Sequence, residues 1–209
     1  MSLSIVFTES EAQIAKNVNA AIATYINDVL SKNLNGIINK VKLLIPNWVM
    51  SQPEIASLSS SDSLSLAGQF GLVNGASAGQ AIANSVAQAT YIKFVKYSNN
   101  LKGGLELQFQ QADFNNLLSL PEGHTIYSGG NLHWLDWLLK RGDSIIVSNY
   151  QYNPATGLGR SGLGNMIGGG SFRVPPQFSG TPDNNFITRA LIGSTQEQQI
   201  TDILQKILT

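Results

Sequence analysis

The sequence predicts an α+β fold in which a small, mainly antiparallel sheet is packed by a long N-terminal helix, a crossing helix and a C-terminal helix. Apolar residues recur every three or four positions over 14–44, which is the period of a helix with one buried face. Leu105, Leu107 and Phe109 alternate with polar residues, which indicates a half-buried strand. With a length of 209 residues, these patterns favour a single domain over residues 1–209.

The longest predicted element is a helix over about 9–45. Thr8 and Glu11 have the spacing of a capping box at its start. Gly36 is expected to weaken or bend the helix, and Pro46 to end or kink it. Such a rod is about 50 Å long at ~1.5 Å per residue, which is more than a compact domain of this size needs. Part of its apolar stripe is therefore expected to contact a neighbouring molecule, and the candidates for this interface are Ile22, Ile26 and Leu30.

Several shorter elements are expected between this helix and the middle of the chain. Their patterns predict, in chain order, a short helix, a strand, a helix, and two strands that form a hairpin. These elements are placed over residues 51–58, 64–72, 77–90, 91–97 and 105–109.

The segment 129–150 is predicted to hold the crossing helix and the strand that follows it. Gly142 stands where a helix usually ends, and the β-branched run 145–147 indicates a buried strand. Asp136 lies one turn before Lys140, so the two are expected to form an ion pair on the helix. Large apolar side chains here and near the C-terminus are assigned to the core, namely Trp134, Trp137, Leu138, Ile146 and Phe186.

Residues 153–170 are predicted to form a glycine-rich loop before a short strand at 171–174. Residues 157–162 match GxGxxG, a pattern of dinucleotide-binding sites. That pattern must open a helix, whereas the glycines of 163–170 disfavour one, so nucleotide binding is disfavoured. The loop is instead expected to contact an adjacent subunit, through Gly157, Gly159, Arg160, Gly162, Asn165 and Met166.

The C-terminal segment is predicted to form two helices. Asp183 is expected to cap a helix over 184–192, in which Phe186 is apolar. Ser194 and Glu197 have the capping-box spacing at the start of the last helix, which is amphipathic.

Composition limits the classes of function. Charged residues make up 12%, about half of the usual ~25%, and the formal net charge is zero. This composition fits either a polar, loop-rich protein or a subunit whose surface is covered in an assembly. It argues against a broad basic face for nucleic acid. No apolar run approaches the ~20 residues of a membrane span, so no membrane association is expected.

The candidate catalytic and metal-binding residues are few. The chain has no cysteine, and its two histidines, His124 and His133, lack the spacing of a zinc site. A Gly-x-Ser-x-Gly elbow for a nucleophilic serine is also missing. The sequence therefore predicts a protein that is not an enzyme and that binds no cofactor or metal.

Four segments carry a resemblance to a known class of proteins. They read LIPNWVMSQPEI in the N-terminal part and LHWLDWLLKRGDSIIV, GRSG and SFRVPPQFSGTPDNNFITRAL within about 90–192. In pattern and order they resemble structural proteins of tailed bacteriophages of the neck or tail-completion type, which join head to tail. The resemblance implies a virion protein that forms a ring, often sixfold, between the head connector and the tail.

The same resemblance implies a set of partners and a location. The partners are further copies of the chain, connector or portal-side proteins, and the tail terminator or tube. DNA passes through the lumen without specific recognition. The implied location is the neck or tail of the virion, and the host cytoplasm during assembly. Alternatives are a tail terminator or another tail structural protein, and, from a different class, a small hydrolase or nucleotide-binding enzyme.

Overall fold

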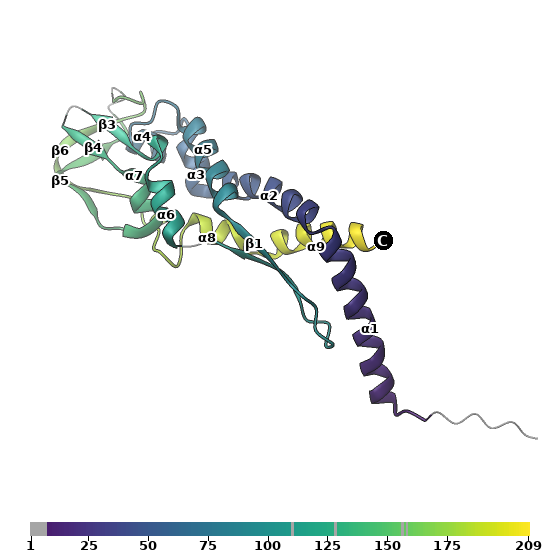
Figure 1. Ribbon diagram of the computed structural model, residues 1–209. Helices are drawn as coiled ribbons and strands as arrows, with labels where there is room; N and C mark the ends of the chain where they lie inside the picture. Colours follow the sequence, from purple (N-terminus) through teal and green to yellow (C-terminus); the bar gives the residue numbers. More distant parts are fainter. Residues whose placement is uncertain (1–7, 110, 128, 156, 158) are drawn as a thin grey trace, which may run out of the picture.

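The chain folds into an α+β structure whose elongated outline is set by its N-terminal helices (Figure 1). The computed structural model describes residues 8–109, 111–127, 129–155, 157 and 159–209. The α+β class and the antiparallel pairing of the strands are confirmed. The described strands, however, form three separate two-stranded sheets in place of the one expected sheet. Within these residues, no helix is both long enough and apolar enough to cross a lipid bilayer.

Two helices make up the N-terminal rod, α1 (Glu11–Lys32) and α2 (Leu34–Met50). The prediction of one continuous helix is wrong, because the chain leaves helical geometry at Asn33, where φ is −102° and ψ is 7°. The Asn33 side-chain amide donates to the carbonyl oxygen of Val29 at 2.9 Å, and such local bonds compete with the helical ones. From this break, α1 leaves the body at an angle to α2 (Figure 1).

Both ends of the predicted rod also differ from expectation. Ser10 rather than Thr8 caps α1, since its side chain accepts a hydrogen bond from the Gln13 backbone N–H. At the other end, α2 continues through Pro46 to Met50. Proline costs the helix one backbone hydrogen bond, and the packing of apolar side chains on both sides of Pro46 offsets this loss. The buried residues of α2 are Ile37, Val41, Ile45, Trp48 and Val49.

Three helices follow, α3 (Pro53–Leu58), α4 (Leu66–Gln69) and α5 (Gly75–Ala89). The strand predicted over 64–72 is wrong. Ser65 instead starts α4, accepting a hydrogen bond from the Gly68 N–H at 3.3 Å. At the start of α5, a Cβ on Gly75 would lie 1.5 Å from the Leu58 carbonyl oxygen, so only glycine allows α5 to begin so close to the end of α3.

The three sheets are hairpins. The first, β1 (Tyr91–Val95) with β2 (Gly104–Gln108), confirms the predicted hairpin. The second, β3 (Thr125–Tyr127) with β4 (Gly130–Leu132), was not expected. The third pairs two nine-residue strands, β5 (Ile145–Asn153) and β6 (Asn165–Arg173). Between the first two hairpins lie α6 (Gln111–Leu118) and a 3-10 turn, η1 (Pro121–Gly123).

The crossing helix consists of an α-helical turn, α7 (Trp134–Asp136), and a π-helical turn, η2 (Trp137–Arg141). Gly142 ends it with φ of 62°, as expected for a glycine at that place. In a π-helix, residues five apart share a face. Asp136 accordingly forms an ion pair with Arg141, in addition to the expected pair with Lys140 at 3.9 Å.

The residues assigned to the core differ in burial. Trp134, Leu138 and Phe186 are buried, and the Trp134 ring stacks on Phe70 with 5.4 Å between centroids. Trp137 and Ile146 pack against this core but are only half-buried. The guanidinium of Arg141 lies 5.2 Å from the centre of the Trp137 ring, which is cation–π geometry.

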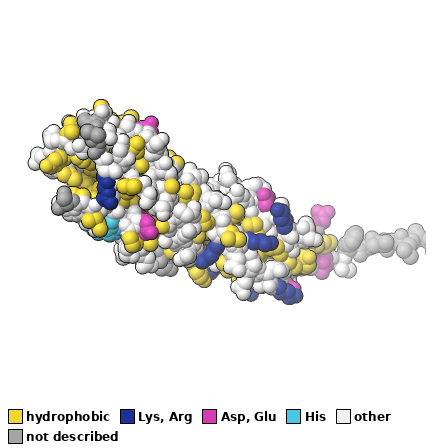
Figure 2. All heavy atoms as spheres, turned by 90° about the horizontal axis from the view of Figure 1, so that it is seen from above, with side chains coloured by type: hydrophobic (Ala, Val, Ile, Leu, Met, Phe, Trp, Pro, Cys, Tyr) yellow, Lys and Arg dark blue, Asp and Glu magenta, His cyan; other side chains and the backbone are white. Residues whose placement is uncertain are grey.

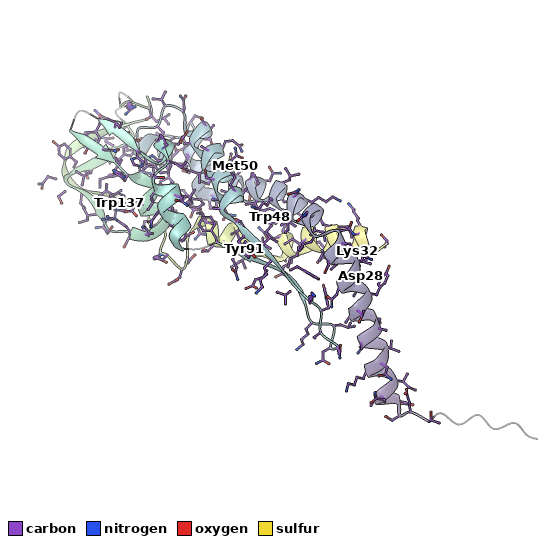
Figure 3. All side chains as sticks on the ribbon, in the orientation of Figure 1. Asp28, Lys32, Trp48, Met50, Tyr91 and Trp137 are labelled. Atoms are coloured by element: carbon purple, nitrogen blue, oxygen red, sulfur yellow. The ribbon has the colours of Figure 1, made fainter. Side chains whose placement is uncertain are left out.

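The C-terminal helices α8 (Phe186–Leu191) and α9 (Ser194–Leu208) pack on the N-terminal half. Asn185, rather than Asp183, caps α8 in a capping box with Thr188. Arg189 of α8 forms an ion pair with the buried carboxylate of Glu54 in α3. The indole of Trp48 in α2 (labelled in Figure 3) donates to the side-chain oxygen of Gln199 in α9 at 2.6 Å.

Trp134→Ala is expected to lower the free energy of unfolding by about 3–5 kcal/mol, because it removes a fully buried ring and leaves a cavity. Trp137→Ala should lower the free energy of unfolding by a smaller amount, since part of the Trp137 ring is exposed to solvent in the wild type. Chemical denaturation of both variants measures the difference. An equal or larger loss for Trp137→Ala would contradict this description of the core.

Candidate interaction surfaces

The interface residues predicted from the sequence separate into two groups that lie at opposite ends of the molecule (Figure 1). One group lies on α1, which projects from the body. The other lies at the broad end, where the β3–β4 and β5–β6 hairpins meet. On the face shown in Figure 2, hydrophobic side chains gather at the broad end and again toward the projecting end.

Four large apolar side chains form an exposed line along α1, here called the α1 stripe. Their exposed fractions are 38% for Ile14, 50% for Val18, 40% for Ile22 and 60% for Tyr25. The steps of four, four and three residues place them on one helical face. Of the other two predicted interface residues, Ile26 is half-buried and Leu30, 1% exposed, belongs to the core. Leu30 is therefore not available to a partner.

The C-terminal part of α1 is bonded to the body of the molecule, whereas its first turns are exposed. The side-chain amide of Asn27 donates to the Tyr97 carbonyl oxygen at 2.9 Å, and its oxygen accepts from the Tyr97 N–H at 2.7 Å. These bonds join α1 to the end of the β1–β2 hairpin, and α9 also packs on α1. Residues 11–18 are all exposed, so the first turns of α1 make little contact with the body.

At the broad end, the predicted glycine-rich loop 153–170 is wrong in its second half. Residues from Asn165 onward form β6 and pair with β5, which leaves a shorter connection. The ladder is irregular where Gly169 (φ 100°) and Gly170 (φ 73°) lie across from Asn149 (φ 64°). This is a β-bulge, which glycines permit because they adopt positive φ without strain. The glycines at 168–170 are therefore compatible with strand β6 and place a bulge in it.

A cleft of about 500 Å³ opens between the two hairpins and α4, and it is here called the hairpin cleft. Four of the six loop candidates line it, Gly159, Arg160, Asn165 and Met166, whereas Gly157 and Gly162 do not. Aromatic and aliphatic side chains provide most of its walls, namely Phe70, Tyr127, Leu132, Val147, Tyr150, Tyr152 and Phe172.

The polar groups of the hairpin cleft are few. Among the described residues that line the cleft, Arg160 is the one with a charged side chain. Its guanidinium donates to the Ile126 carbonyl oxygen, which connects the two hairpins. Thr125 is 8% exposed, and its hydroxyl has no hydrogen-bond partner in the described part of the chain. A buried hydroxyl without a partner costs free energy.

Tyr152 fixes one wall of the cleft. Its hydroxyl donates to the Ser63 carbonyl oxygen at 2.7 Å, which joins β5 to the segment before α4. Burial raises the pKa of this phenol above its ordinary value, and the nearby Asp62 carboxylate raises it further. The phenol therefore stays a neutral donor at physiological pH.

The two histidines do come together, which the sequence did not predict. The rings of His124 and His133 lie 4.0 Å apart between centroids. Nε2 of His124 donates to the Leu118 carbonyl oxygen at 2.7 Å, and Nδ1 then accepts from the Asn131 amide at 3.1 Å. These partners account for His124 as a structural residue. No group of three or more metal-ligating side chains occurs in the residues that the structure covers.

Thr125 and Tyr127 could not be recognised from the sequence, because β3 is three residues long and shows no periodic pattern. No family model, no curated protein and no solved structure matches this chain.

Gly164→Ala is expected to lower the melting temperature, because a Cβ there would lie 2.2 Å from the Tyr152 hydroxyl and disturb its bond to Ser63. Gly168→Ala is the matched control in the same hairpin, since a Cβ at that position meets no atom within 4 Å. Thermal unfolding of both variants tests the packing of this wall. Equal melting temperatures would show that the Tyr152 contact is not needed.

Proposed function

We propose that this protein is a structural protein of the virion of a tailed bacteriophage, and that it forms a ring in the neck that joins the head connector to the tail. The observation that carries the assembly part of the proposal is the α1 stripe. The neck is proposed from the resemblance of the chain segments to neck and tail-completion proteins.

The α1 stripe supports assembly on energetic grounds. Fully burying a side chain of this type contributes roughly 1.5–3 kcal/mol, so four of them on one face form a favourable contact surface. A helix whose first turns lack tertiary contacts is also marginal in water by itself. A neighbouring subunit that covers the stripe would stabilise the helix and remove the exposed apolar surface together.

Composition supports the same proposal. A chain with zero net charge and 12% charged residues has little electrostatic repulsion between copies. In a ring, each subunit uses two different surfaces, one toward each neighbour. An elongated subunit with apolar surfaces at opposite ends fits this kind of contact. DNA in the lumen of such a ring requires passage and not affinity, so a neutral chain is compatible with that role.

Val18→Asp is expected to prevent assembly, because it places a carboxylate in the centre of the α1 stripe. Lys16→Asp is the matched control: it changes a nearby exposed position on another face of the same helix. Size-exclusion chromatography with light scattering should give a multiple of 22.5 kDa for the wild type and the control, and 22.5 kDa for Val18→Asp. A monomeric wild type at all concentrations would contradict the proposed ring.

Deletion of the gene from the phage that carries it tests the proposed place in the virion. Negative-stain electron microscopy should show DNA-filled heads and separate, finished tails. Abnormally long tails would indicate a tail terminator instead. Normal particles would contradict a virion function of either kind.

A further inference from the structure

The hairpin cleft has the properties of an unfilled binding site. Its volume of about 500 Å³ is within the roughly 300–1,000 Å³ of ligand sites, and its walls are aromatic and aliphatic. Arg160 is exposed and forms no ion pair with any carboxylate of the described residues. An occupant should therefore carry an apolar face and one anionic group.

The β5–β6 hairpin, which forms one wall of the cleft, is largely exposed. It is a two-stranded ribbon whose middle residues are exposed on both strands, 148–151 and 168–171. Two-stranded ribbons alone are at best marginally stable in water. A partner seated in the cleft would cover part of this ribbon.

The α1 stripe has the chemistry that the cleft requires. Glu11 lies three residues before Ile14, so it continues the same helical face and gives the apolar line a carboxylate at its outer end. A carboxylate accepts hydrogen bonds from a guanidinium. Glu11 is thus complementary to Arg160, while Ile14 and Val18 are complementary to the apolar walls.

We propose that the hairpin cleft of one subunit receives the α1 stripe of the next copy, with Glu11 pairing with Arg160. The two surfaces lie at opposite ends of one chain, so the contact must be between chains (Figure 1). It is a helix-in-groove contact that repeats from subunit to subunit, and such a head-to-tail contact forms a ring where its rotation closes. This inference rests on the proposed self-assembly and specifies which surfaces meet.

The absence of cysteine from the sequence makes cross-linking a clean test. Ile14→Cys on the stripe is mixed with Tyr150→Cys in the cleft, and a short bis-maleimide is added. Lys16→Cys and Gln151→Cys are the matched controls: each is exposed on the same element, and neither is among the stripe or cleft residues. Only the Ile14→Cys and Tyr150→Cys mixture is expected to give an adduct of two chains.

Three results would overturn the proposed contact. They are linkage of Ile14→Cys to itself, equal linkage with the controls, and no linkage although light scattering shows a ring. In each of these cases the ring itself would stand. A wild-type chain that is monomeric by light scattering would refute both the ring and this contact.

Charge exchange gives an independent readout. Glu11→Arg and Arg160→Glu should each raise the concentration needed for assembly about tenfold, as expected for the loss of an interfacial charge pair worth about 1.4 kcal/mol. The chain that carries both substitutions should recover assembly relative to Arg160→Glu alone, because the pair is restored with reversed signs while both chains lack the Arg160–Ile126 hydrogen bond. Failure of the double variant to recover would contradict the Glu11–Arg160 pairing.

Discussion

The apolar face of α2 is covered by α5, α8 and α9, and the arrangement of the body depends on that burial. Ile37, Val41 and Ile45 have no exposed surface, so displacing any covering helix would open the centre of the core. The ion pair between Glu54 and Arg189 joins α3 to α8 across the same core. Because the Glu54 carboxylate is buried, losing Arg189 would leave an uncompensated charge, which fixes the relative placement of these helices.

The body built around α2 leaves its two ends incomplete. At one end, the break at Asn33 directs α1 away from the core, so the apolar period that buries Leu30 continues outward into the exposed Val18 and Ile14. At the other end, two hairpins meet without a helix to fill the cleft between them. The same apolar period therefore gives core residues at the C-terminal end of α1 and exposed residues toward its N-terminal end. The exposed residues are the basis of the proposed assembly.

Much of this fold could be predicted from periodicity, and the departures have local physical causes. The β1–β2 hairpin and the amphipathic N-terminal helix were predictable because their patterns are long. The break at Asn33 was not, since only one residue leaves helical geometry there and the apolar period continues on both sides of it. Arg160 and Met166 of the predicted loop line the cleft, but so does Thr125, which lies in a strand too short to recognise from the sequence.

Complementation of a gene deletion tests whether the exposed apolar residues of α1 serve virion assembly. A phage that lacks the gene is supplied with the wild-type chain, Val18→Asp or Lys16→Asp, and infectious particles are counted. Near-normal titres are expected for the wild type and Lys16→Asp, and a loss of infectious particles for Val18→Asp at equal levels of folded protein. Equal titres for all three would contradict a role of the α1 stripe in assembly.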